Sequence, residues 1–225
     1  MKGIDQRPRD RSPRYVVPTS LGCYGLLNET WDGWIKAVLS HVLSRPESPR
    51  WSRAWMDELC GRFEWEGKQA ERRVKWLVQR GYLELVKTSI GVPSGGVSEA
   101  VEDLLLRWSP RGQAALIDRR GLCIAMVGFS PKVVDALAAL SSKLMGALEH
   151  EGETLSEVLG LRHAVPCVVD ARGHHPVCFF EFHVGPECLT AVVVGPPRFS
   201  DASFRDLTWL LWRRYGCEDQ GRATG

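Results

Sequence analysis

The sequence predicts an α+β protein in which a helix-rich N-terminal half precedes a small domain with an antiparallel strand meander. Three observations predict this class: helical spacing of apolar residues between residues 31 and 80, three strand-like runs between residues 164 and 194, and a final amphipathic helix. At 225 residues, 44% of them hydrophobic and 25% charged, the chain is long enough to build two small domains with buried cores.

The apolar runs are too short to span a bilayer, and the start of the chain lacks the apolar core of a signal peptide. We therefore expect a cytoplasmic protein with no membrane contact. The seven cysteines are scattered and odd in number, unlike a secreted disulfide framework. We expect most of them to be reduced and buried: Cys23, Cys60, Cys123, Cys167, Cys178, Cys188 and Cys217.

The net charge of +2 hides an uneven distribution, because basic residues are in excess up to residue 120 and acidic residues afterwards. Residues 1–14 are rich in Arg and Pro, so we expect a disordered basic arm there. The favoured interpretation of this arm is a solvated tail. The alternative is an arm that follows a nucleic-acid backbone, because clustered Arg neutralises phosphates. The mild basic excess is compatible with nucleic acid, although a strongly basic domain is its usual mark.

Three helices are predicted after a strand or loop at residues 15–27. The first begins near Asn28 or Thr30, buries an apolar stripe that starts with Trp31 and Trp34, and ends before Pro46. The second buries one side formed by Trp51, Trp55, Met56, Leu59 and Phe63. The third spans residues 68–80, turns a basic face to solvent and buries Ala70, Val74, Leu77 and Val78.

A hairpin is predicted after the third helix. Gly81 ends that helix, residues 82–87 form a strand, a Gly- and Ser-rich loop follows, and residues 104–108 return as the second strand. Three helices followed by such a hairpin, or wing, describe a winged helix-turn-helix. We therefore expect a winged helix-turn-helix domain at residues 15–120.

Two motifs beside this hairpin resemble the winged-helix regulators of the MarR and PadR kind. Residues 78–84 match the Gly-aromatic-Leu approach to the wing, and residues 108–116 match the hydroxyl-x-x-Gly turn into the next helix. The resemblance covers about two-fifths of the chain. It implies the fold and no ligand. The predicted wing departs from a DNA-binding pattern because it contains Glu99, Glu102 and Asp103.

Residues 121–217 are predicted to form the second, small α+β domain, with a tail at residues 218–225. It opens with a buried strand at residues 122–129, a helix at residues 131–149 and a weaker helical stretch at residues 154–159. We expect this domain to sense a signal or to hold two chains together.

The second half of this domain has three strands at residues 164–170, 176–183 and 189–194. Their short connections predict an antiparallel meander. The last helix, residues 201–215, leaves Trp209 and Trp212 off its main apolar stripe, so these rings need some other apolar cover.

A dense set of His and Cys invites a zinc site: His163, Cys167, His174, His175, Cys178, His183 and Cys188. Only His175 and Cys178 have the tight spacing of structural zinc sites, and Cys178 and His183 point to opposite faces of a strand. We predict no metal and no cofactor. No nucleophile elbow, catalytic triad or phosphate-binding loop occurs, so we predict no enzyme.

The best candidate for binding is the basic face of the third helix with one residue of the hairpin. Arg and Gln at the start of such a helix reach base edges in the major groove, and basic residues further along meet phosphates. The predicted DNA-binding residues are Lys68, Gln69, Arg72, Arg73, Lys75 and Lys87. A solvated charged face is the ordinary alternative, and Trp76 on the same face would suit a protein partner as well.

The leading hypothesis is a dimeric DNA-binding transcriptional regulator that reads duplex DNA with the helix at residues 68–80. The alternative is a non-enzymatic interaction or adaptor protein in a larger assembly, with the winged helix as a protein-docking scaffold. Nine tryptophans, the acidic hairpin and the mild net charge favour the alternative. A protein partner would bind Trp76 or the pair Trp209 and Trp212, and a second copy of the chain is one such partner.

Overall fold

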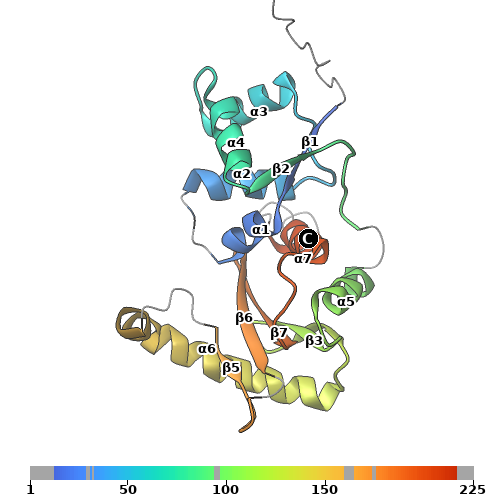
Figure 1. The fold of residues 1–225 in the computed structure, drawn as a ribbon, viewed down its shortest axis with the longest axis vertical. Helices are drawn as coiled ribbons and strands as arrows, with labels where there is room; N and C mark the ends of the chain where they lie inside the picture. Colours follow the sequence, from blue (N-terminus) through green and yellow to red (C-terminus); the bar gives the residue numbers. More distant parts are fainter. Residues whose placement is uncertain are drawn as a thin grey trace, which may run out of the picture.

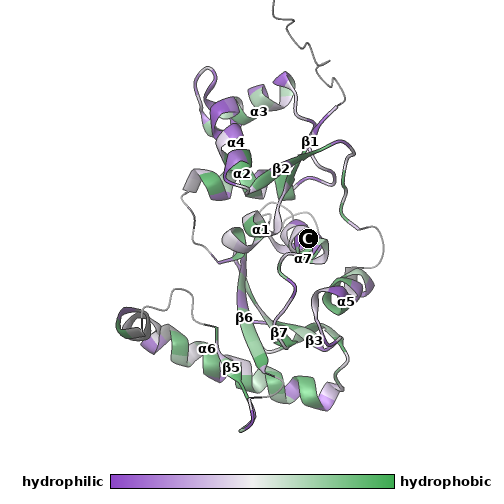
Figure 2. Ribbon diagram, viewed as in Figure 1, coloured by the Kyte–Doolittle hydropathy of each residue, from purple (hydrophilic) through white to green (hydrophobic). Residues whose placement is uncertain are grey.

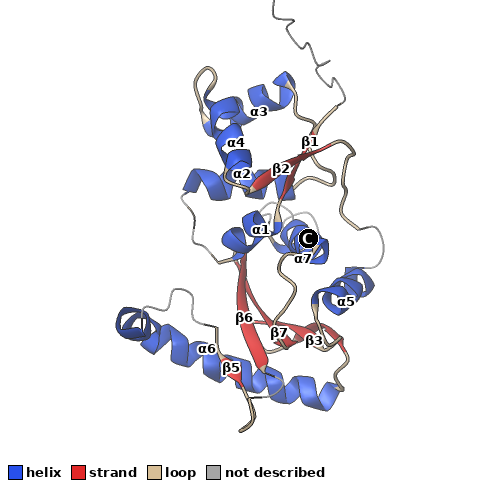
Figure 3. Cartoon of the chain, viewed as in Figure 1, coloured by secondary structure: helices blue, strands red, loops and turns tan. Residues whose placement is uncertain are grey.

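The computed structural model describes residues 13–28, 31, 33–93, 97–159, 165–173 and 176–216. The predicted arm up to residue 12, the predicted tail at residues 218–225, and His163, His174, His175 and Cys217 lie outside the described residues. The described elements are β1 (Tyr15–Pro18), α1 (Ser20–Leu27), α2 (Gly33–Leu43), α3 (Arg53–Phe63), α4 (Gln69–Gln79), β2 (Leu83–Val86), α5 (Val97–Trp108), β3 (Ala114–Asp118), β4 (Cys123–Val127), α6 (Pro131–Leu159), β5 (Cys167–Val168), β6 (Val177–Val184), β7 (Glu187–Val194) and α7 (Ala202–Tyr215) (Figures 1 and 3).

A five-stranded antiparallel sheet lies in the second half of the chain, in the order β4-β3-β7-β6-β5. Strands β5, β6 and β7 are neighbours in chain order, which confirms the predicted meander. Strand β3 lies between β4 and β7 and pairs antiparallel with both. The protein is therefore a mixture of helices and antiparallel sheets, as the sequence predicts.

Successive side chains of a strand point to opposite sides of the sheet, and in this sheet both sides carry apolar residues. Helices therefore cover both faces. Ile117, Phe179 and Val192 lie on the face covered by α6, where they pack with Val134 and Ala138. Helices α1, α5 and α7 lie on the other side of the sheet from α6 (Figure 1). The alternate residues of the strands belong to a larger core shared with these helices: Leu116, Phe182, Val184, Leu189 and Val193. None of the described helices, α6 included, is long and apolar enough to cross a membrane.

The remaining elements, α2, α3 and α4 with β1 and β2, lie on the other side of α1 and α7 (Figure 1). The three helices predicted for this part of the chain are confirmed. Ser52 caps α3 by accepting a hydrogen bond from the Trp55 N–H, and the positive φ of Gly81 follows α4. Strand β2 pairs antiparallel with β1, from Tyr15 opposite Val86 to Pro18 opposite Leu83.

The predicted wing is wrong, because its returning strand is part of a helix. Residues 104–108 belong to α5, and β2 pairs with β1 instead. The side chains of Val101, Leu104, Leu105 and Trp108 are all buried, at spacings of three and four residues. That spacing is the period of a helix face, and it outweighs the strand propensity of a short apolar run.

Two further local predictions are wrong. Residues 110–116 do not turn into a helix, because β3 begins at Ala114. Residues 20–27 form helix α1, which was predicted to be strand or loop. Two glycines let α1 pack closely: a Cβ on Gly22 would meet the Tyr82 carbonyl oxygen, and a Cβ on Gly25 would meet the Trp31 ring.

Helix α7 is buried around its whole circumference. Six consecutive residues, 207–212, are buried, and six residues span more than one helical turn. Trp209 and Trp212 are 0% and 3% exposed, and the Trp209 indole N–H donates a hydrogen bond to the Arg45 carbonyl oxygen at 2.9 Å. The predicted partner contact through Trp209 and Trp212 is therefore wrong, because the same chain covers both rings.

Trp108 occupies the centre of the aromatic core between α5, α7 and the sheet. Its ring is fully buried and stacks on Phe204 with centroids 5.7 Å apart. Phe182 and Phe199 contact the same ring at 5.8 and 5.6 Å. Aromatic pairs at these distances add stabilisation beyond the area that they bury.

Replacement of Trp108 by Ala should lower the free energy of unfolding by about 3–5 kcal/mol, because it leaves a large cavity among packed rings. Leu106→Ala is the matched control, since Leu106 lies on the same helix but is 51% exposed, and its effect should stay within about 0.5 kcal/mol. Urea unfolding followed by circular dichroism measures both. Equal losses for the two variants would contradict this description of the core.

Candidate protein-docking surface

Helix α4 carries most of the residues predicted to bind DNA. Lys68 and Arg72 are exposed beside Lys75, on one side of the helix. Lys75 Nζ forms an ion pair with Glu71 Oε1 at 2.7 Å, and this lysine lowers the pKa of the Glu71 carboxyl. Gln69 Oε1 accepts a hydrogen bond from the Glu66 N–H. Two members of the predicted set are thus used within the chain.

Arg73 and Lys87 lie apart from that side of α4. The Arg73 guanidinium carbon is 4.3 Å from the centre of the Trp65 ring and 5.1 Å from that of Trp34, so the charge rests on aromatic faces. Lys87 is exposed directly after the end of β2. The structure therefore does not gather the six predicted residues on one face.

Three tryptophans and a tyrosine form a connected aromatic cluster beside α4. The Trp34 ring is 6.4 Å from Trp65 and 5.5 Å from Trp76, and Trp76 is 5.9 Å from Tyr82. All four rings are partly exposed. Together with the guanidinium groups of Arg73 and Arg80, they form what we name the tryptophan–arginine surface: Trp34, Trp65, Arg73, Trp76, Arg80 and Tyr82.

The end of α3 brings Trp65 into this surface. Glu64 adopts a left-handed conformation with φ of 53°, and the Trp65 N–H then donates a hydrogen bond to the Cys60 carbonyl oxygen. This turn places the Trp65 ring 5.0 Å from Phe63 and beside Trp34. Of the aromatic residues here, sequence reasoning selected only Trp76 as a binding residue. The high density of Trp and Arg in this part of the sequence could have indicated Trp34 and Trp65 as further binding residues.

A second feature, a cavity of about 710 Å³, lies at the junction between β2, α1 and α7. Apolar residues line part of it, notably Leu21, Tyr24 and Phe199, and Tyr24 contacts Phe199 edge to face at 5.2 Å. Glu84 and Arg205 supply the charged part of the lining. Sequence reasoning missed this place because its residues come from distant parts of the chain.

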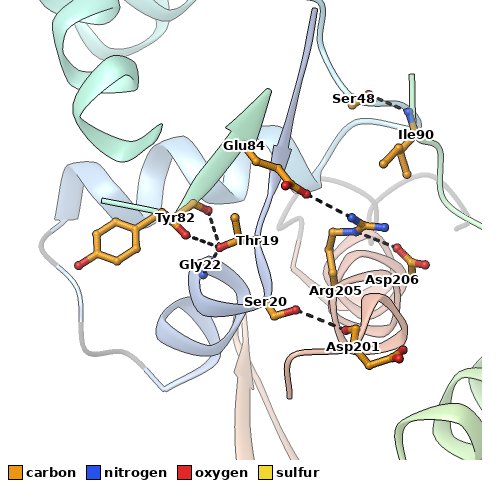
Figure 4. A network of polar contacts seen from close by, with 11 residues as sticks. Thr19, Ser20, Gly22, Ser48, Tyr82, Glu84, Ile90, Asp201, Arg205 and Asp206 are labelled. Atoms are coloured by element: carbon orange, nitrogen blue, oxygen red, sulfur yellow. Dashed lines mark hydrogen bonds and ion pairs between the residues drawn. The ribbon is translucent and has the colours of Figure 1, made fainter. Parts of the chain in front are cut away.

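Polar contacts around this cavity link its walls, as Figure 4 shows. Arg205 Nη1 is 3.6 Å from Glu84 Oε1, and Arg205 Nε donates to Asp206 Oδ1 at 3.0 Å. The Thr19 hydroxyl donates to the Gly81 carbonyl oxygen at 2.6 Å and accepts from the Gly22 N–H, which caps α1. Glu84 and Arg205, the charged groups of the cavity, pair with each other. We therefore interpret the cavity as a contact region that holds β2, α1 and α7 together and not as a binding site.

The His and Cys residues of the second half do not gather into a metal site within the described residues. No group of three or more metal-ligating side chains is placed to hold an ion in that part of the chain. Cys167 lies opposite Cys178 in the sheet, while the Cys188 thiol donates to Glu181 Oε1 at 2.8 Å.

No family model matches the chain, and no curated protein matches its sequence. Among solved structures, a Roadblock/LC7 domain from Streptomyces avermitilis is 19% identical, with 52% of this chain and 92% of that chain covered and a TM-score of 0.35. The gliding protein mglB from Thermus thermophilus is 20% identical, with 55% and 94% covered and a TM-score of 0.36. MglB in a tetrameric arrangement is 21% identical, with 55% and 93% covered and a TM-score of 0.38.

The family resemblance inferred from the two short motifs is wrong, because the wing that it implies is missing: residues 104–108 belong to α5, and β2 pairs with β1. The second motif also leads into strand β3 and not into a helix. The prediction of a DNA-binding transcriptional regulator rests on this resemblance and is wrong with it. None of the three similar structures is described as a MarR or PadR regulator.

Replacement of Arg73 by Ala should lower the free energy of unfolding by about 1 kcal/mol, because its guanidinium stabilises two tryptophan rings. Arg72→Ala is the matched control: it removes an exposed arginine from the same helix and should change stability by less than about 0.5 kcal/mol. Urea unfolding monitored by tryptophan fluorescence measures both. A larger loss for Arg72→Ala would contradict the assigned contacts.

Proposed function

We propose that the protein is a non-enzymatic interaction or adaptor protein that docks a partner protein on the tryptophan–arginine surface. The observation that carries the proposal is the set of partly exposed rings of Trp34, Trp65 and Trp76 beside Arg73 and Arg80. Tryptophan, tyrosine and arginine are the side chains that contribute most of the binding energy at protein interfaces.

The charges around these rings define the chemistry of the partner. Arg73 lies on the Trp65 ring, Arg80 is exposed and lies on the Trp76 ring, and Figure 2 shows α4 as largely hydrophilic. Lys75 adds little positive charge because Glu71 pairs with it. The matching partner is a protein segment that presents acidic side chains next to an apolar one.

The rings are also held in place before a partner arrives. Trp34 contacts Trp65 and Trp76, and the two arginines lie on ring faces. A side chain that is already ordered loses less conformational entropy on binding. The packed rings therefore lower the entropic cost of docking a protein segment.

The test uses a fluorescent peptide that alternates Glu or Asp with Leu, and measures its binding to the full-length protein by fluorescence polarisation. Trp76→Ala should weaken binding roughly 10-fold or more, because it removes a central aromatic anchor. Arg80→Ala should weaken it less, since this change removes one charge and leaves the rings in place. Circular dichroism verifies that both variants are folded.

Two controls make the result specific. A peptide with Asn and Gln in place of the acidic residues should bind more weakly. Val133→Ala, on the exposed side of α6, should leave the affinity unchanged. Binding that is insensitive to Trp76→Ala, or that random duplex DNA displaces as readily as the peptide does, would overturn the proposal. So would a dimer by light scattering that Trp76→Ala dissociates, because the surface would then bind a second copy.

A further inference from the structure

Cys167 and Cys178 face each other across two neighbouring strands of the sheet. They are direct register partners in the antiparallel pair β5 and β6, and their sulfur atoms are 2.7 Å apart. The Phe179 N–H donates to the Pro166 carbonyl oxygen at 3.0 Å, so residues 166 and 179 form the hydrogen-bonded pair. The adjacent pair, Cys167 and Cys178, is therefore of the non-hydrogen-bonded kind, in which the Cα atoms lie about 4.5 Å apart.

That spacing meets the requirement of a disulfide, for which Cα separations of roughly 4.4–6.8 Å are usual. The other described cysteines have no such neighbour. Cys188 lies opposite His183, and Cys123 lies opposite Ile117. Cys60 lies in α3 with its sulfur 3.7 Å from the Gly67 carbonyl oxygen, and Cys23 is fully buried in α1. Among the described cysteines, Cys167 and Cys178 are the ones that the sheet register pairs.

We propose that Cys167 and Cys178 form a reversible redox site, which a low-molecular-weight disulfide such as oxidised glutathione converts to an intrachain disulfide. The reaction fastens the edge strand β5 to β6. Strand β5 is only two residues long and both residues are exposed, so few contacts hold it on the sheet. A covalent link to β6 therefore strengthens its attachment to the sheet considerably.

The two thiols have different roles in this reaction. Cys167 is exposed and meets the oxidant, whereas burial and the neighbouring Cys167 thiol raise the pKa of Cys178 to about 12. The thiolate is the attacking species, so the exposed sulfur reacts first and the buried one second.

The steps balance as thiol–disulfide exchange. Cys167 loses its proton to water, and its thiolate attacks one sulfur of oxidised glutathione, which forms a mixed disulfide and releases one glutathione thiolate. Cys178 then loses its proton and attacks Cys167 Sγ, which releases the second glutathione. The two cysteines lose two electrons and two protons, and one glutathione disulfide becomes two thiols.

The experiment treats the reduced full-length protein with oxidised glutathione and follows intact mass and peptide mapping. The parent and the control Cys123→Ser should each lose two hydrogen atoms, with the new bond mapped to Cys167 and Cys178. Cys167→Ser should not form this bond. Cys178→Ala should retain glutathione on Cys167, because the second sulfur that displaces it is gone.

A second measurement tests the effect on the strand. The Phe179 amide hydrogen, which bonds across the pair, should exchange with solvent roughly 10-fold more slowly after oxidation, because β5 opens less often. Stable glutathione on Cys167 of the parent, or a disulfide that maps to other cysteines, would overturn the proposal. So would unchanged exchange at Phe179 in the oxidised protein.

Discussion

The burial of α7 is the constraint on which the rest of the structure depends. A helix that is buried around its whole circumference, as α7 is from residue 207 to residue 212, must be covered on all sides, and one sheet or one helix covers only a single face. On one side of α7, Phe204 packs on Trp108 of α5 and on Phe182 of the sheet. On another side, the Trp209 indole N–H donates a hydrogen bond to the carbonyl oxygen of Arg45, which follows α2. The buried cluster consequently includes residues from β1 through to α7.

The same requirement explains the surroundings of α7. Helix α1 contacts both α7 and β6, and its two small residues Gly22 and Gly25 leave room for the neighbouring backbone and ring. Glu84 and Arg205 form an ion pair at the edge of this contact, where solvent weakens it. Apolar packing therefore supplies the stability of the junction, and the polar contacts set its geometry.

Aromatic packing also changes what the basic residues of α4 can do. A positive charge on a ring face is partly satisfied by the ring, so Arg73 contributes to the tryptophan–arginine surface and is less available to phosphate. Lys75 is likewise paired with Glu71. A count of basic residues therefore overstates the free positive charge that this helix offers to phosphate.

The sequence by itself determined those features that depend on residues close together in the chain. Apolar spacing located α2, α3, α4 and α7, and short connections between strand-like runs predicted the meander of β5, β6 and β7. Trp76 was also recognisable as a candidate for protein contact, because a large aromatic residue interrupts a basic helix face. Helix α5 was predictable too, since Val101, Leu104 and Trp108 have helical spacing. It was missed because residues 104–108 were assigned to the second strand of a hairpin.

Only the tertiary structure decided which distant segments meet. It paired β2 with β1 and excluded the wing, and it covered Trp209 and Trp212 within the chain. It also placed Trp65 and Arg73 beside Trp34 and set Cys167 opposite Cys178. Hydrophobic burial and hydrogen-bond register act between residues that are close in space, and local sequence spacing records nothing about which distant partner a buried face will select.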